Sequence, residues 1–234
     1  MSSTENPSGA ARRSTRRNLT ASSPFNKMAS EYDAWFDKDG SLIFFIEVQA
    51  FKTISMSLPK PWLEIGIGSG RFAQALGIET GIDPSINLVK MARQRVIKTF
   101  RGRGEHTPFD NGEFGTIFLI VTLCFLDSPL VVIKEASRIL APGGKIVLGL
   151  VLKESPWGLF YQQKKDEGHR FYKYATFYSH DEVVSLLTQA DFTAEKTVST
   201  LFQKPDGVKN GEIPREGYFP DAGFTIITAG KKDK

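Results

Sequence analysis

The sequence has little of what would place it in several large classes of protein. It has a single cysteine, Cys124, so no internal disulfide can form. Its three histidines and this cysteine show no zinc-binding spacing, and we expect no metal site. The longest apolar stretch, 116–126, is far shorter than the roughly 20 residues that span a bilayer. We therefore expect a protein without a membrane partner in a reducing, cytoplasmic setting.

The composition is otherwise that of an ordinary globular chain. Hydrophobic residues make up 41% and charged residues 24% of the sequence, which excludes collagen-like, coiled-coil and mostly disordered proteins. A net charge of +4 first suggests an anionic partner such as nucleic acid. However, residues 1–24 carry +3 and residues 231–234 carry +2, whereas the body at 25–230 carries −1. The basic excess lies in the tails, which argues against a nucleic-acid partner.

The first 24 residues differ in composition from the rest. They are rich in Ser, Thr and Arg and contain two large apolar side chains, Met1 and Leu19. Such a segment buries too little surface to offset its ordering entropy, so residues 1–24 are expected to be a disordered basic tail. The composition also suits an organellar transit peptide, which stays open as an alternative. Residues 25–234 are expected to form one domain, as a monomer or a homodimer.

Two helix-like stretches lead the domain, and strands and helices alternate after them. Apolar residues recur at helical spacing from Phe25 to Phe36 and again over 42–57, so 25–58 is expected to form cap helices. The alternation predicts an α/β fold with a seven-stranded, mostly parallel sheet, helices on both faces and an antiparallel final strand. The strands are expected at 62–67, 78–82, 96–100, 115–121, 145–152, 192–201 and 223–229, with helices at 71–76, 85–95, 129–140 and 179–189 and a turn at 141–144.

Two motifs follow the first two expected strands. The segment Leu-Glu-Ile-Gly-Ile-Gly-Ser-Gly at 63–70 places glycines where a strand turns into a helix, the position at which open α/β sheets bind ligands. Its third glycine comes one residue earlier than in the dinucleotide fingerprint, which argues against a nicotinamide-dependent oxidoreductase. Asp83 ends the second strand, where a carboxylate can accept hydrogen bonds from both ribose hydroxyls.

With three further segments, these motifs resemble the class I S-adenosylmethionine-dependent methyltransferases, specifically the small methyltransferase type 11 group. The resemblance covers about residues 25–230 and implies a Rossmann-like fold. It depends on Tyr-Asp-Ala-Trp-Phe at 32–36, the segments at 63–70 and 81–85, Pro-Phe-Asp-Asn-Gly-Glu-Phe at 108–114, and Arg-Ile-Leu-Ala-Pro-Gly-Gly at 138–144.

The resemblance implies a cofactor, S-adenosyl-L-methionine, and the residues that bind it. Glu64 would hold the methionine ammonium, directly or through water, and Asp83 the ribose hydroxyls. The chain departs from the family at Arg103, where relatives often have an acid. The other implied cofactor residues are Gly66, Gly68, Ser69 and Gly70 in the turn, Pro84 or Ser85 beside the adenine, Gly104 and Glu105 in the loop after the third strand, and Thr122 with Leu123 near the methyl-transfer point.

The expected acceptor site is less sharply defined. Eight aromatic residues lie within 157–178, and in this family the insertion after the fifth strand, here 153–178, often forms a lid over the acceptor. An aromatic wall suits a ring-bearing or cationic acceptor, whereas a small satellite core is an equal alternative. No general base is required by methyl transfer as such. The candidates are Tyr32, Trp35, Trp157, Tyr161 and Tyr172 for the pocket and His169, ahead of His106 and His180, for a base; Cys124 is expected to be a core residue.

The function expected from these features is methyl transfer to a small-molecule acceptor by in-line displacement. The segment after the fourth expected strand lacks the Asp/Asn-Pro-Pro-aromatic signature with which amino-methylating DNA enzymes grip a base. A methyltransferase acting on protein or RNA, and a non-catalytic protein that binds S-adenosylmethionine, remain alternatives. No residue pattern selects an amine over oxygen, carbon or sulfur as the methylated atom.

Overall fold

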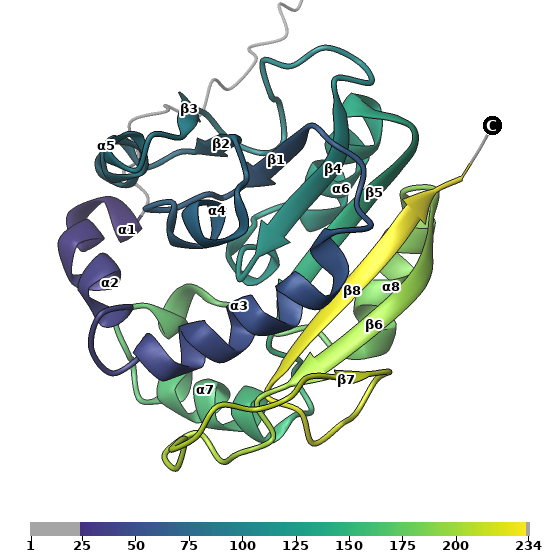
Figure 1. The fold of residues 1–234 in the computed structure, drawn as a ribbon. Coiled ribbons are helices and arrows are strands. Elements are labelled where there is room, and N and C mark those ends of the chain that lie inside the picture. The colour runs from purple at the N-terminus through teal and green to yellow at the C-terminus, as the bar shows by residue number, and fades with distance from the viewer. Residues whose placement is uncertain (1–23, 233–234) are drawn as a thin grey trace, which may run out of the picture.

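A single twisted sheet forms the centre of the molecule (Figure 1). The computed structural model describes residues 24–232; residues 1–23 of the expected tail, and 233–234, lie outside the described part. The strand order is β3-β2-β1-β4-β5-β8-β6-β7. The strands are β1 (Trp62–Ile65), β2 (Thr80–Asp83), β3 (Lys98–Arg101), β4 (Phe114–Ile120), β5 (Leu140–Leu150), β6 (Phe192–Thr200), β7 (Arg215–Glu216) and β8 (Phe224–Lys231).

The strand directions confirm the α/β prediction. β1, β2, β3, β4 and β5 pair in parallel, and β8 pairs antiparallel with both β5 and β6. Two details differ from the expectation. A two-residue strand, β7, adds an eighth member to the sheet. The expected turn at 141–144 belongs to β5, because the pairing with β4 skips from Leu140 to Lys145 and the extra residues bulge outward.

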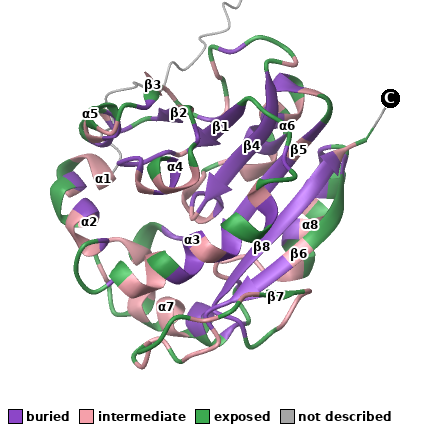
Figure 2. Ribbon diagram, viewed as in Figure 1, coloured by how far each residue is buried: buried purple, intermediate pink, exposed green. Residues whose placement is uncertain are grey.

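Helices cover both faces of the sheet, and each face has its own apolar core. One core packs α3 and α4 against the sheet through residues such as Phe51 and Phe72, and the other packs α6 and α8 through residues such as Ile133 and Leu187. Figure 2 shows the central strands buried between these layers. The helices are α1 (Pro24–Lys27), α2 (Ala29–Trp35), α3 (Ser41–Ser55), α4 (Arg71–Leu76), α5 (Ile86–Gln94), α6 (Pro129–Ile139), α7 (Pro156–Asp166) and α8 (His180–Gln189), with 3-10 turns η1 (Leu123–Phe125) and η2 (Tyr172–Tyr174).

Local sequence signals explain where several helices begin. The expected capping box is present at α8, where Ser179 accepts from the Glu182 backbone and Glu182 accepts in return from the Ser179 backbone. α7 lies inside the aromatic insertion, and Ser155 caps it ahead of Pro156. Within residues 24–232, no helix is long and apolar enough to cross a membrane.

The parallel strands place their carboxyl ends at one edge of the sheet. β1 leads there into the turn at 66–70, β2 ends at Asp83, and β4 leads to Thr122. The cap helices lie at the same edge, since Asn26 of α1 accepts hydrogen bonds from Ser85 and Asn87 at the start of α5. Residues from four separate segments therefore meet at this edge, where open α/β sheets bind ligands.

Candidate functional site

The turn after β1 has a backbone that only glycine adopts easily. Gly66, Gly68 and Gly70 have φ angles of +78°, +56° and +83°, in the left-handed region. A Cβ atom on Gly66 would lie 2.4 Å from the Thr122 side chain. The turn is thus held against the end of β4, and its backbone stays open to a ligand.

Asp83 is fixed by the turn that it faces. Its Oδ2 accepts a hydrogen bond from the Gly68 amide at 3.0 Å, and its Oδ1 accepts one from the Ser85 amide at 2.8 Å. Burial raises the pKa of Asp83 to about 6, against the lowering effect of these two hydrogen bonds. Each oxygen keeps a second lone pair, so the carboxylate can accept a further hydrogen bond at both.

Glu64 lies behind the turn and lacks a partner. It is 2% exposed, and its Oε2 has no hydrogen-bond partner among the residues described. Burial, and then the Asp83 charge, hold the pKa of this carboxyl well above its usual range. A buried carboxyl oxygen without a donor is unfavourable unless a water or a cation supplies one. Glu64 is therefore suited to a cationic group placed at the turn.

A cavity of about 390 Å³ opens over this turn. It is lined by seven of the residues expected to bind a cofactor, whereas Glu64, Ser69 and Gly70 do not line it. The seven are Gly66, Gly68, Asp83, Pro84, Gly104, Glu105 and Thr122.

Arg103, which departs from the family pattern, joins two acids at the far end of this cavity. Its Nη2 lies 2.8 Å from Glu105 Oε1 and 2.7 Å from Asp127 Oδ2. Asp127 follows η1 and lines the same cavity. The sequence did not single it out, because nothing local marks it as facing the loop after β3. An acid from another segment, Asp127, therefore lies beside Arg103 at this cavity.

A second cavity, of about 530 Å³, adjoins the first, and eleven of its 26 lining residues are Phe, Tyr or Trp; we call it the aromatic cavity. Phe25, Tyr32, Val121 and Phe125 line both cavities and form the wall between them. The aromatic cavity lies between the cap helices and the insertion after β5, to which its wall residues belong in large part.

The aromatic cavity contains most, but not all, of the expected pocket residues. Tyr32, Trp35, Tyr161 and Tyr172 line it. Trp157 does not, since it is 2% exposed and donates a hydrogen bond from Nε1 to the Gln203 carbonyl at 2.8 Å. It occupies the first turn of α7, whose buried side faces the core, so its place in the pocket is corrected to a core position.

His169 and Cys124 also line the aromatic cavity, whereas His106 and His180 line neither cavity. His169 stacks on Tyr172 with ring centroids 4.7 Å apart, and partial burial and the nearby Arg170 lower its pKa. Burial raises the pKa of Cys124 to about 12, so the thiol stays protonated and is a poor nucleophile. Cys124 is thus a half-buried residue of the cavity wall and not the core residue that the sequence predicted.

Glu47 is a cavity residue that was not singled out from the sequence. It lies on α3 among the residues that line the aromatic cavity and is 6% exposed. Burial raises its pKa to about 8. It is the single acid in the apolar stretch at 42–57, and that isolation was the signal available in the sequence.

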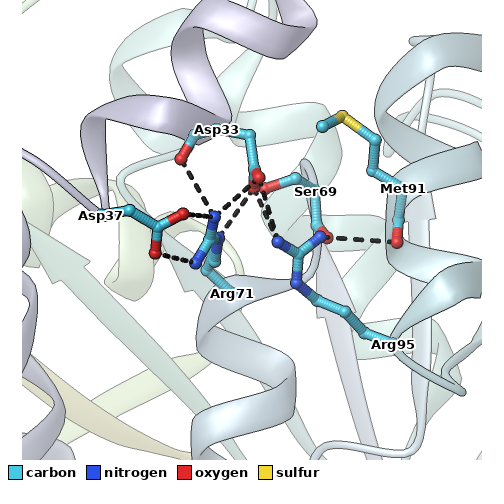
Figure 3. A network of polar contacts seen from close by, with 6 residues as sticks. All are labelled: Asp33, Asp37, Ser69, Arg71, Met91 and Arg95. Carbon is cyan, nitrogen blue, oxygen red and sulfur yellow. Dashed lines mark hydrogen bonds and ion pairs between the residues drawn. The ribbon is translucent and has the colours of Figure 1, made fainter.

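A network of charges ties α2 to the start of α4 and the end of α5 (Figure 3). Asp33 lies 2.7 Å from Arg71 and 3.0 Å from Arg95. Arg71 also pairs with the exposed Asp37, and Arg95 donates to the Ser69 carbonyl at 2.9 Å. These contacts fix α2, the cap helix that carries Tyr32, to the start of α4 directly after the glycine turn and to the end of α5.

Comparison with known proteins identifies relatives along nearly the whole chain. Residues 63–148 match the family model described as "Methyltransferase domain". An uncharacterised protein of Methanocaldococcus jannaschii is 39% identical over 208 residues, which are 88% of this chain and 98% of that protein. A crystal structure from Thermotoga maritima, named as a SAM-dependent methyltransferase and possible histamine N-methyltransferase, is 36% identical with a TM-score of 0.83 and covers 89% of this chain and 99% of its own.

A more distant structure shares the fold. Geranyl diphosphate C-methyltransferase from Streptomyces coelicolor, crystallised with S-adenosyl-L-homocysteine, is 15% identical with a TM-score of 0.56. The match covers 79% of this chain and 75% of that one. At this identity the likeness concerns the sheet and its helices alone.

Proposed function

The chain belongs to the S-adenosylmethionine-dependent methyltransferases, and from that premise we propose that its methyl acceptor is a small molecule bound in the aromatic cavity. The enzyme class and the cofactor follow from the family. The acceptor and the role of each site residue are the proposal.

For the cofactor, we assign the cavity over the glycine turn. Asp83 would bind the ribose hydroxyls through the lone pairs that Gly68 and Ser85 leave free. Glu64 would bind the methionine ammonium, directly or through a water, because its buried Oε2 lacks a donor. The adenine would lie toward Pro84 and the loop at Gly104, where Arg103 holds Glu105 and Asp127.

One observation carries the small-molecule proposal: an aromatic cavity adjoins the cofactor cavity across a wall that they share. Its volume of about 530 Å³ falls within the range of about 300–1,000 Å³ that is usual for small-molecule sites. Tyr32 and Val121 belong to both cavities, so a methyl group delivered from one side would meet an acceptor on the other.

The bound cofactor supplies an activated methyl group with a good leaving group. The protein's part is to hold the acceptor in line and to exclude water, and such orientation is worth about 7–11 kcal/mol. Thr122, which contacts the glycine turn through the Gly66 carbonyl at 3.3 Å, fixes the end of β4 beside the wall between the cavities. A base is required only for an acceptor that is protonated at the working pH, and His169 is the histidine within the cavity.

The name of the Thermotoga relative, a possible histamine N-methyltransferase, fits a ring-bearing amine as acceptor. Protein or RNA as acceptor fits less well, because a macromolecule would have to present its target through the cap helices and the insertion. The body's charge of −1 also offers no excess of positive charge for a polynucleotide.

The test is a panel of small molecules, a total RNA preparation and a protein extract, each assayed for release of S-adenosylhomocysteine. We expect micromolar binding of S-adenosylmethionine by calorimetry and turnover with members of the small-molecule panel. Methylation of RNA or protein alone would overturn the proposed acceptor. Cofactor binding without any turnover would instead support a non-catalytic binding protein.

A further inference from the structure

Among the described residues, one buried carboxyl in the aromatic cavity has neither a hydrogen bond nor an ion pair with another side chain or with the backbone. Glu47 is 6% exposed and lines the cavity, and among residues 24–232 it accepts no hydrogen bond and forms no ion pair. The other acids in the cavity wall, Glu31 and Asp39, are exposed at its mouth. The interior of the cavity therefore carries a single carboxyl group.

No buried cation in the described wall matches this carboxyl. Lys38 and Arg170, the two basic residues that line the cavity, are both exposed. Arg170 forms an ion pair with the exposed Glu31, so its charge is already neutralised at the mouth of the cavity. The interior is thus complementary to a positive ligand and offers no partner to a carboxylate or a phosphate.

Two tyrosine hydroxyls of the same cavity do not hydrogen bond to Glu47 either. Tyr161 and Tyr172 lie with ring centroids 4.4 Å apart, and within the described residues neither hydroxyl donates a hydrogen bond to Glu47. Burial is the main cause that raises the pKa of Tyr161 and of Tyr172, and the negative charge of Glu47 adds to it in both. The tyrosine pair is a neighbour of the carboxyl and not its hydrogen-bond donor.

The surrounding rings add a second feature that attracts cations. Tyr32, Trp35, Phe171 and the tyrosine pair all line the same cavity. The faces of aromatic rings carry negative charge density and attract ammonium groups, most strongly where the site is desolvated. A carboxylate together with several rings is a combination that binds a cation on an apolar body.

A purely structural role explains Glu47 poorly. α3 packs its apolar residues Ile46, Val48 and Phe51 against the sheet, and a leucine or glutamine at position 47 would avoid the burial of a carboxyl. Burying an acid without a partner is unfavourable for the fold, and ionisable groups placed so in a cavity are associated with function.

We propose that Glu47 is the acceptor-binding carboxylate, and that the acceptor carries a cationic amine joined to an aromatic or similarly apolar body. The proposal depends on the small-molecule function above and narrows it to a substrate class. It makes Glu47 the residue that distinguishes amines from their neutral and anionic counterparts.

The test compares three probes of similar size that differ in charge: phenethylamine, phenethyl alcohol and phenylacetate. Each is titrated by calorimetry at pH 8.5, above the pKa of about 8 to which burial raises Glu47, into the full chain saturated with S-adenosylhomocysteine. We expect phenethylamine to bind at least tenfold more tightly than phenethyl alcohol, and phenylacetate to bind most weakly. Glu47→Gln, which keeps the shape of the side chain, should lower the affinity for phenethylamine at least tenfold and leave that for phenethyl alcohol within twofold.

Two further variants test whether charge is the cause. Glu47→Asp keeps the charge but shortens the side chain, so its affinity for phenethylamine should lie between those of wild type and Glu47→Gln. Glu195→Gln removes an exposed acid that pairs with Lys145, away from the cavity, and should bind like wild type. Circular dichroism of each variant checks that it is folded.

The outcomes separate this inference from the proposed function. Equal binding of the amine and the alcohol, no effect of Glu47→Gln, or no heat from phenethylamine up to about 20 mM, which is well into the range of weak binding, would overturn the role of Glu47. In each case, binding of S-adenosylhomocysteine and turnover of a neutral acceptor would leave the proposed function standing. Failure of S-adenosylhomocysteine itself to bind would overturn the proposed function instead.

Discussion

Replacing Asp33 with asparagine should separate the cap helix α2 from the glycine turn. Asp33 binds Arg71 through both of its carboxylate oxygens, at 2.8 Å and 2.7 Å, and lies 3.0 Å from Arg95. The asparagine would keep the size of the side chain but lose the charge that both guanidinium groups share. Arg71 would keep Asp37, whereas Arg95 would keep only backbone carbonyls as partners.

The magnitude follows from the protonation of Asp33. Burial opposes ionisation, yet hydrogen bonds from Arg71 and Arg95 lower its pKa from 3.8 to about 2. That difference corresponds to about 2.5 kcal/mol of stability at neutral pH, and little of it is screened because the side chain is 11% exposed. In a domain of this size, the loss would lower the melting temperature by about 5–10 °C.

The sign of the pH dependence is also fixed. Because the folded-state pKa lies below the unfolded value, the stabilisation is complete above pH 3.8 and is lost as the pH falls through about 2. The difference between wild type and Asp33→Asn should therefore be constant from pH 6 to 8 and shrink in acid. Thermal unfolding followed by circular dichroism across this range measures it.

The matched control is Asp37→Asn. Asp37 pairs with the same Arg71 but is 63% exposed, so water replaces most of what the mutation removes. We expect Asp37→Asn to melt close to wild type. If the two variants lose the same stability, or if Asp33→Asn loses none, the network in Figure 3 does not hold α2 in the way described.

Three further predictions concern the two cavities. Asp83→Asn should weaken S-adenosylmethionine binding at least tenfold. Wild-type affinity should decline as the pH falls below about 6, and that of the variant should change less with pH, because Glu64 is then the only one of the two acids at the proposed cofactor site that titrates; calorimetry at several pH values checks both. Gly66→Ala should abolish cofactor binding, since its Cβ would lie 2.4 Å from Thr122, whereas Gly77→Ala, with a similar φ but nothing within 4 Å, should bind the cofactor normally. Glu47→Gln should gain stability over wild type by about 3 kcal/mol between pH 5.5 and 8 in urea unfolding, because a pKa raised from 4.5 to about 8 makes the wild-type fold less stable as the pH rises through that window.

The order of strands and helices could be predicted from the sequence because it depends on local patterns. The fully apolar run at 115–121 became the central strand β4, and the last two apolar segments became the antiparallel pair β6 and β8. The two-residue strand β7 has no apolar pattern that could mark it. The Ala-Pro-Gly-Gly segment at 141–144 has the local pattern of a turn, and only pairing with β4 makes it a bulge within a strand.

The two cavities differ in how many of their lining residues could be predicted from the sequence. The cavity over the glycine turn is built from strand ends, where one segment fixes both the backbone and the side chain, so spacing could single out Gly66 and Asp83, which line it. The aromatic cavity is assembled from segments far apart in the chain. Trp157 is buried because its side of α7 faces the core, and Glu47 lines the cavity because of how α3 packs. A local sequence pattern shows neither of these orientations.

The contacts of α2 connect the two proposed binding sites. Tyr32 lines both cavities, and the next residue, Asp33, is bound to Arg71 directly after the glycine turn. A displacement of α2 would therefore move the wall between the cavities and loosen its attachment to the cofactor turn at the same time. Under the proposed assignment, a cofactor that orders the turn also orders this wall for the acceptor, and thermodynamic linkage then requires the acceptor to favour the cofactor by the same factor. We therefore expect the cap helices to act as the structural connection between cofactor binding and acceptor binding, with Asp33 as the contact through which it passes.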